Sequence, residues 1–383
     1  MSIRRASIAI IGGGMQGLML AFCLAERGMK DIAVFDAGYW QGGASGRNGT
    51  MVRGGFSSPE WTRFFGHSHR LWLGLSRRLG HNVMYTQRGY AILAESDKTA
   101  AVIEESLQVQ RDCGVASHPL SQGELARRIP IVARARVKSA MIFEDGGTAP
   151  HHAVMKGLRA ACEERGVALH YGAAITAIER QNGRAAGVRR GEELVTADAT
   201  VIAAGAHSPA VAELAGVELE GRPWRLEAMA TEPLRPVLDQ ALALLDRTVY
   251  MHQTARGEIV GGCEVHGDFA GATLASDLPV MAHYARHLVE MMPSLAELRI
   301  LRQWAGIIHA SADFAPLLGP HPDCRDLWIS AGWSYGVMGA PAAGALLAEA
   351  IATGRIDDRM APFAVDRKRR GRLIREAAIV VSD

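Results

Sequence analysis

The sequence predicts an α/β protein whose chain opens on a parallel, dinucleotide-binding sheet. Two apolar runs, at residues 7–11 and 32–35, have the pattern of strands covered on both faces. A glycine-rich turn at residues 12–17 and an apolar helical pattern separate the runs, and Asp36 ends the second one. This order of strand, turn, helix, strand and acid is typical of the first half of a Rossmann-like domain.

The turn reads Gly12-Gly13-Gly14-Met15-Gln16-Gly17 and contains Gly-x-Gly-x-x-Gly. The first glycine of this pattern allows a tight turn, the second lets backbone approach a pyrophosphate, and the third permits close packing of helix on strand. Asp36 is placed to accept hydrogen bonds from an adenosine ribose. Glycines alone are common in structural turns, so the prediction of a dinucleotide site depends on all five features together.

The other elements follow from the same patterns. Apolar runs predict further strands of the first sheet at residues 167–170, 174–178, 200–206 and 327–330, and a small-residue helix at about 340–352. A second, sheet-based region is predicted from strands at residues 90–94, 141–143, 249–252 and 258–261. A helix in this region is opened by the capping box from Ser121 to Glu124.

Composition excludes several classes of protein. The chain has 383 residues, 48% of them hydrophobic, which suits about two globular domains of roughly 150 residues each. Its net charge of +2 provides no field to hold nucleic acid. Five scattered cysteines form neither a zinc pattern nor a disulfide framework and favour the cytoplasm. We expect no secretory signal and no membrane span.

Four glycine-rich segments distributed along the chain point to one long cofactor. They lie at residues 12–17, 42–49, 203–206 and 332–336, and Gly-x-Gly-x-x-Gly does not occur again. A separate NAD domain is therefore not expected. FAD is long enough to cross the domain, and its isoalloxazine ring would lie near the second and fourth segments.

Several motifs resemble those of the D-amino-acid-oxidase-type flavoproteins, and most of all the beta subunit of heterotetrameric sarcosine oxidase. They are the N-terminal turn, Ser45-Gly46-Arg47-Asn48, Gly146-Gly147-Thr148-Ala149, Ala203-Ala204-Gly205 and Gly332-Trp333. The resemblance extends over nearly the whole chain. It includes Leu71-Trp72, Tyr85-x-Gln87-Arg88-Gly89 and Thr231-Glu232-Pro233.

The resemblance implies a discontinuous arrangement of domains. An FAD-binding domain would comprise residues 1–85, 147–217 and 314–383. A sheet-based substrate domain would comprise residues 86–146 and 218–313. It also implies a small amino or imino acid as substrate, and a complex with a larger alpha-type subunit and small partner subunits. The basic tail at 367–372 ends in apolar residues 379–381 and is either solvated or a docking segment for such a partner.

The family pattern implies the residues that contact FAD, which we expect to bind without a covalent link. No cysteine lies near Gly306, where monomeric sarcosine oxidases attach FAD. The helix after Gly336 is placed to point its N-terminus at the reduced ring, with Pro341 near its first turn. The expected contacts are Gly12, Gly13, Gly14, Met15, Gln16, Gly17, Asp36, Ser45, Gly46, Arg47, Asn48, Ile175, Ala204, Gly205, Gly332, Gly336, Met338 and Gly339.

Four residues are candidates for the substrate site. Arg53 follows the second glycine-rich loop, where related sarcosine oxidases carry a carboxylate-binding arginine, and a guanidinium binds a carboxylate in bidentate fashion. Tyr250 and His252 lie on a predicted strand that faces the flavin, although ordinary strand residues are an equal alternative. Tyr335 belongs to the turn that lies beside the ring.

His151 is a candidate for a second flavin. It shares the apolar stripe of Val154, Met155 and Leu158, and it resembles the histidine that carries covalent FMN in the sarcosine oxidase beta subunit. Pro150 and His152 replace the basic and acidic residues that flank that histidine in the family. A core histidine is therefore the alternative.

One departure from the family concerns the substrate. Sarcosine oxidases carry a lysine in the stretch that here reads Val337-Met338-Gly339, and that lysine helps hold the substrate carboxylate. Its absence argues against sarcosine and leaves D-amino acids, hydroxyproline-type imino acids and opines open. It also leaves a second hypothesis, a flavin-binding scaffold subunit without its own turnover.

Overall fold

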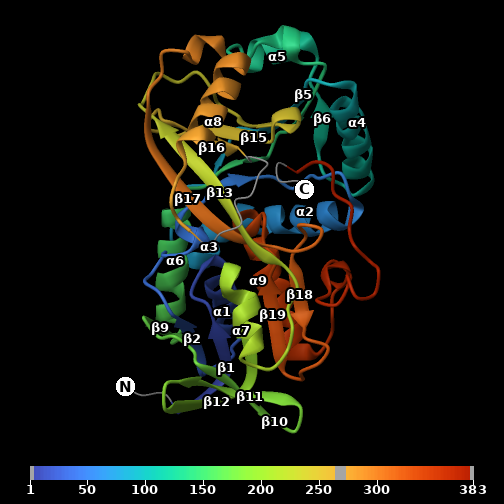
Figure 1. Ribbon diagram of the computed structural model, residues 1–383. Helices are drawn as coiled ribbons and strands as arrows, with labels where there is room; N and C mark the ends of the chain where they lie inside the picture. The colour runs from blue at the N-terminus through green and yellow to red at the C-terminus, as the bar shows by residue number, and fades with distance from the viewer. Residues whose placement is uncertain (1–3, 264–272, 380–383) are drawn as a thin grey trace.

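The computed structural model describes residues 4–263 and 273–379, and their strands form two eight-stranded sheets and one three-stranded sheet. In Figure 1 the first eight-stranded sheet occupies the lower half of the molecule and the second occupies the upper half. The short three-stranded sheet consists of β3 (Met51–Val52), β4 (Thr86–Gln87) and β8 (Gly147–Thr148).

The lower sheet has a parallel centre in the order β12, β1, β2, β9. Its strands are β1 (Arg5–Ile11), β2 (Ile32–Asp36), β9 (Ala168–Tyr171), β10 (Ala177–Gln181), β11 (Arg184–Arg190), β12 (Glu193–Ile202), β18 (Leu317–Pro320) and β19 (Leu327–Ala331). Ile8 of β1 pairs with Ala199 on one side and with Ile32 on the other. This register brings the ends of β1, β2 and β12 to one edge, where a ligand of an open α/β sheet binds.

The upper sheet is antiparallel except between β14 and β5. Its strands are β5 (Tyr90–Ala94), β6 (Ser117–Pro119), β7 (Ser139–Phe143), β13 (Arg222–Thr231), β14 (Ala241–Leu244), β15 (Val249–Gln253), β16 (Ile259–Cys263) and β17 (Ile300–Ala310). The long strands β13 and β17 pair with each other and descend from the upper half toward the lower half (Figure 1).

Helices cover the two sheets and connect them. They are α1 (Met15–Glu26), α2 (Pro59–Leu73), α3 (Leu75–Leu79), α4 (Asp97–Asp112), α5 (Gln122–Arg128), α6 (His151–Glu164), α7 (Ser208–Glu213), α8 (Leu278–Met291) and α9 (Gly336–Thr353). Ser121 and Glu124 make the predicted capping box of α5. In α1, residues 15–24 are all buried because the helix packs against β1 and β2 and against α6 and α9.

Three predicted boundaries are wrong. Residues 174–176 form a loop, so β10 begins only at Ala177, and β12 ends at Ile202 because Gly205 turns the chain at φ +56°. The last long helix begins at Gly336, so Pro341 lies inside it and not in its first turn. The earlier start moves the helix N-terminus to the residue after Tyr335.

Helix α9 also qualifies the expectation about membrane spans. By length and composition alone it is apolar enough to cross a membrane, but 67% of it is buried inside the protein. It packs against α1 and α2, and a Cβ at Gly344 would lie 2.6 Å from the side chain of Met19. These features are those of a core helix whose small residues allow close packing.

Candidate active site

The glycine-rich turn between β1 and α1 has the geometry of a cradle. At Gly12, φ is +118° and an added Cβ would lie 2.2 Å from the carbonyl oxygen of Ala203; at Gly17 it would lie 1.9 Å from the carbonyl oxygen of Gly12. Only glycine fits at either position. At Gly14 an added Cβ would meet only Ser45 Oγ, at 3.1 Å, so this backbone is open to a ligand. The turn therefore fits the pyrophosphate of FAD.

Asp36 lies against this turn. Its Oδ2 accepts a hydrogen bond from the Gly13 amide at 2.7 Å and its Oδ1 accepts one from the Gly38 amide at 2.8 Å. A carboxylate offers about four acceptor positions, so capacity for a ribose hydroxyl remains. Tyr171 closes the other side by donating to the carbonyl oxygen of Gly13 at 3.3 Å.

The second glycine-rich loop docks onto the start of α1. Ser45 Oγ accepts a hydrogen bond from the Met15 amide at 2.9 Å, and Gly46 has no room for a Cβ beside Gln41. Arg47 extends the loop toward β17, where its carbonyl accepts from Trp304 Nε1 at 3.0 Å. The loop thus connects the cofactor turn to the upper sheet.

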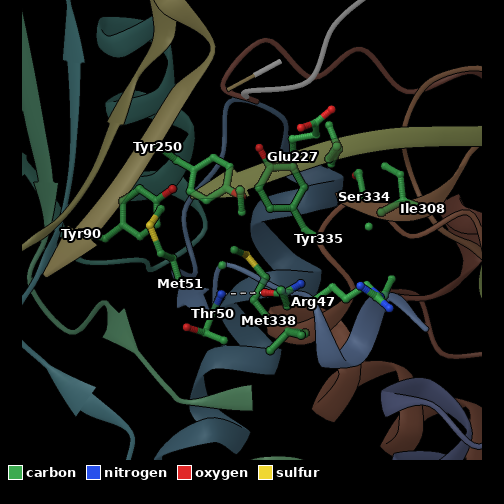
Figure 2. Close-up of a pocket in the computed structure, with 17 residues that line it drawn as sticks. Arg47, Thr50, Met51, Tyr90, Glu227, Tyr250, Ile308, Ser334, Tyr335 and Met338 are labelled. Atoms are coloured by element: carbon green, nitrogen blue, oxygen red, sulfur yellow. Dashed lines mark hydrogen bonds between the residues drawn. The ribbon is translucent and has the colours of Figure 1, made fainter. Parts of the chain in front are cut away.

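A cavity of about 790 Å³, counting the space at its mouth, lies between this loop, the start of α9 and the upper sheet. Figure 2 shows three tyrosine rings on its upper side and Arg47 and Met338 on its lower side. Its lining includes Arg47, Asn48, Thr50, Met51, Tyr90, Glu227, Tyr250, Gly306, Ile308, Ser334, Tyr335 and Met338.

The N-terminus of α9 opens into this cavity, with Val337 and Met338 in the lining. Gln16 ties it to α1, because Gln16 Nε2 donates to the carbonyl oxygen of Gly336 at 2.7 Å. The positive end of a helix dipole stabilises negative charge at its first turn. The predicted role for this turn is therefore sterically available, and the stretch of residues 337–339 contains no lysine.

Tyr250 and Tyr335 line the cavity as the sequence indicated, and Tyr90 joins them. Burial raises the pKa of Tyr90 and of Tyr250 above the ordinary value, which keeps both phenols protonated and able to donate hydrogen bonds. His252 lies two residues beyond Tyr250 on β15, is 5% exposed, and is not part of the lining. Burial lowers the pKa of its imidazole to about 4, so it is neutral at pH 7.

Arg53 is buried behind the tyrosines and outside the lining of the cavity. Its side chain is 2% exposed, and its guanidinium lies 4.0 Å from the ring centre of Phe56 and 5.3 Å from that of Tyr90. Nη2 donates to the carbonyl oxygen of Ala378 in the C-terminal tail, whereas Nε and Nη1 have no hydrogen-bond partner among the described residues. A buried cation with unsatisfied donors is costly unless an anion binds it.

His151 begins α6 and is half-buried, while Val154, Met155 and Leu158 form the buried stripe. Burial lowers the pKa of His151 to about 4, and its Nε2 is buried without a partner among the described residues. Its neighbour His152 is exposed and bonds through Nδ1 to Gln41, the residue directly before the second glycine-rich loop. The two histidines thus lie beside that loop but not in the cavity.

The remaining predicted contacts shape the backbone. Gly332 has φ +70° and its amide donates to His309 Nδ1 at 3.0 Å. A Cβ at Gly339 would lie 2.6 Å from Trp333, which indicates a packing role. Ala204 and Gly205 follow β12 at the turn that faces Gly12, and Ile175 is a half-buried residue of the loop before β10.

The sequence analysis did not identify Glu227. It lines the cavity and is 3% exposed, and its carboxylate accepts from Gln303 Nε2 at 2.6 Å and from the Asp277 amide at 3.2 Å. Burial raises the pKa of this carboxyl above its usual value. The available signal was an acid within the otherwise apolar stretch 226–230 of β13. Among the described residues, no group of histidine, cysteine and acidic side chains has the arrangement of a metal site.

Comparison with known proteins gives consistent results. A family model described as DAO, FAD dependent oxidoreductase, matches residues 7–350. Sarcosine oxidase subunit beta from Rhizobium meliloti (strain 1021) is 32% identical over 375 residues, covering 96% of this chain and 90% of that protein. The same subunit from Rhodobacter capsulatus is 29% identical, covering 98% and 91%. The solved structure of L-proline dehydrogenase from P. horikoshii superposes with a TM-score of 0.92 at 24% identity, covering 97% and 100%, which confirms the predicted α/β fold.

Proposed function

The chain belongs to the FAD dependent oxidoreductase family, and from this membership we propose that it oxidises the C–N bond of an amino or imino acid as the catalytic, beta-like subunit of a heteromeric oxidase or dehydrogenase. The relatives named sarcosine oxidase subunit beta support the heteromeric part of the proposal. We place the protein in the cytoplasm. Its FAD-binding domain would comprise residues 1–85, 147–217 and 314–383, and its substrate domain residues 86–146 and 218–313.

The observation that carries this proposal is the cavity itself. It lies where the second glycine-rich loop, the start of α9 and the tyrosines of the upper sheet meet, so a cofactor in the cradle and a substrate under the sheet would share it. When bound, FAD supplies an acceptor for the hydride that leaves the carbon next to nitrogen. The phenols of Tyr90 and Tyr250, kept protonated by burial, orient the substrate through hydrogen bonds and help exclude water.

Arg53 is the proposed carboxylate partner. Its guanidinium has five N–H donors, and one of them is used by Ala378. The rings of Tyr90 and Tyr335, 5.3 and 5.9 Å from the guanidinium, lie in the cavity wall. A substrate carboxylate that passes between these two rings would satisfy the unpaired donors while its amino group stays in the cavity.

The alternative is a scaffold subunit that binds flavin without turnover. The absence of a lysine from the stretch Val337-Met338-Gly339, part of which lines the cavity, is the observation that favours it. A panel of D-amino acids, L-amino acids, imino acids and opines, added to the purified complex without oxygen, discriminates between the two. We expect at least one compound to bleach the flavin, whereas a scaffold would stay oxidised with all of them.

The mode of flavin attachment has its own test. We propose that FAD is held without a covalent bond and that His151, with its buried and unpaired Nε2, contacts FMN at the interface with a partner subunit. Acid precipitation of the native complex should release FAD and leave none in the pellet. Absence of FMN from the extract, together with an unmodified His151 peptide in mass spectra, would remove the FMN proposal and leave a core histidine.

A further inference from the structure

The C-terminal tail, residues 374–379, runs back along the segment that carries Arg53. It is fixed upstream by the buried pair of Arg367 and Asp313, and Asp313 Oδ2 accepts from the Ile374 amide at 2.9 Å. Ala378 is fully buried, so the end of the described tail is an integral part of the fold.

Glu376 makes the central contact of this tail. Its Oε1 accepts from the amide and the hydroxyl of Ser57, at 2.9 and 2.5 Å. Its Oε2 accepts from the amide and the hydroxyl of Ser58, at 2.9 and 2.7 Å. Both serines are buried and directly precede α2, whose positive dipole end also attracts a carboxylate. Four hydrogen bonds therefore fix the register of the tail on this segment.

The register has a consequence at Arg53, because the same tail brings the carbonyl oxygen of Ala378 to Nη2. Glu376 Oε1 also accepts from the Ala378 amide at 2.9 Å, so the carboxylate holds the peptide unit that directly precedes the Ala378 carbonyl. Nη2 has two hydrogens, and donation of one to Ala378 leaves a complete bidentate edge of the guanidinium for an anion.

The outer side of the tail is not packed against protein. A second cavity, of about 1740 Å³ counting the space at its mouth, is lined by Ser57, Ser58, Ile374 and Ala377, among others. The tail thus separates this cavity from Arg53, and packing from outside does little to hold it in place. The hydrogen bonds of Glu376 therefore hold the end of the described chain together with the bond from the Ala377 amide to Ser57 Oγ and the burial of Ala378.

We propose that residues 376–378 form one wall of a carboxylate subsite and that Glu376 is the residue that positions Arg53, through Ala378, for the substrate carboxylate. The inference rests on the proposed function, since it assigns the anion at Arg53 to the substrate. Glu376 itself touches neither substrate nor cofactor.

The test uses the flavin-loaded protein and sodium acetate as a probe, with binding read from the change in the flavin spectrum. We expect Glu376→Ala to weaken acetate binding about tenfold or more, the effect of losing an interaction with a charged group, and Glu376→Gln, which keeps one acceptor oxygen, to weaken it less. Arg375→Ala, at the exposed neighbouring position, should change it less than about twofold. For any compound that the protein oxidises, Glu376→Ala should raise KM while kcat stays within about twofold of the wild type.

A double-mutant cycle separates positioning from general damage. If Glu376 acts through Arg53, Glu376→Ala should have no further effect on acetate binding in an Arg53→Met background. An undiminished effect in that background contradicts the proposal, and so does unchanged acetate affinity in Glu376→Ala or loss of flavin from both Glu376 variants. Absence of acetate binding to the wild type contradicts the subsite itself. Acetate titration needs no turnover, so it still decides this proposal if no amino acid bleaches the flavin.

Discussion

The cofactor turn and the Arg53 subsite both suit an anion, but they are built in different ways. The turn uses backbone amides and four glycines within six residues, and its fit depends on the absence of side chains. The Arg53 subsite uses one guanidinium and depends on residues as distant in sequence as Tyr90, Tyr335 and Ala378. An added Cβ at a crowded glycine disrupts a backbone site as a whole. Replacing one side chain in a side-chain site removes only the interactions which that side chain makes.

The largest effect should therefore follow a small change in the turn. Gly17→Ala would place a Cβ 1.9 Å from the carbonyl oxygen of Gly12, and we expect it to cost about 3 kcal/mol or more and to abolish FAD retention. Gly43→Ala is the matched control, because nothing lies within 4 Å of a Cβ there. FAD content per chain and thermal unfolding measure both. Full FAD retention by Gly17→Ala would show that the cradle does not hold the cofactor.

A graded effect is expected in the side-chain site. Arg53→Met should lower kcat/KM by roughly tenfold to a few hundredfold, since a hydrogen bond to a charged group is worth about 1.5–3 kcal/mol, while FAD content stays near normal. Arg47→Met should instead weaken FAD retention first, because Arg47 belongs to the loop docked on the cofactor turn. If the two variants exchange these phenotypes, the assignment of the arginines is wrong.

The difference between the regions also explains what the sequence predicted well. The cradle, Asp36 and the Ser45 loop follow from patterns within the first fifty residues, because the hydrogen bonds that join Asp36 and Ser45 to the turn span only 23 and 30 positions. The sequence predicts a functional role for Arg53. Its contact with Ala378, however, joins residues more than three hundred positions apart, and its place behind Tyr90 also depends on the tertiary fold. An acid within the apolar stretch 226–230 sets Glu227 apart, but only the fold shows that it lines the cavity. The sequence pattern misplaces the start of α9, because a proline is typical of a first helical turn whereas this helix accepts Pro341 in its interior.

The smallest expected effect is on the pH dependence of stability, and it comes from a buried side chain, His252, because backbone amides do not titrate. The pKa of His252 is about 4 when folded and about 6.5 in its ordinary state, so the unfolded chain takes up the proton first as pH falls. The stability contributed by neutral His252 is complete above pH 6.5 and is lost progressively down to pH 4, with about 2 kcal/mol lost at pH 5. Between pH 8 and pH 5 the free energy of unfolding should therefore fall by about 2 kcal/mol less in His252→Leu than in the wild type.

Denaturant unfolding at the two pH values measures this difference. His207→Gln, which alters an exposed histidine, is the control and should follow the wild type. A His252→Leu curve parallel to that of the wild type would mean that His252 is not held neutral by burial.

The central claim is that one cavity joins a flavin to a substrate held by its carboxylate, and matched pairs of compounds test it most directly. Anaerobic stopped-flow reduction of the holoprotein would compare each amino or imino acid with the amine that lacks its carboxylate, such as proline with pyrrolidine and D-alanine with ethylamine. We predict that at least one acid reduces the flavin and that its amine does so at least about tenfold less efficiently in kcat/KM terms. Equal reduction by acid and amine, or no reduction by any acid, would contradict the claim.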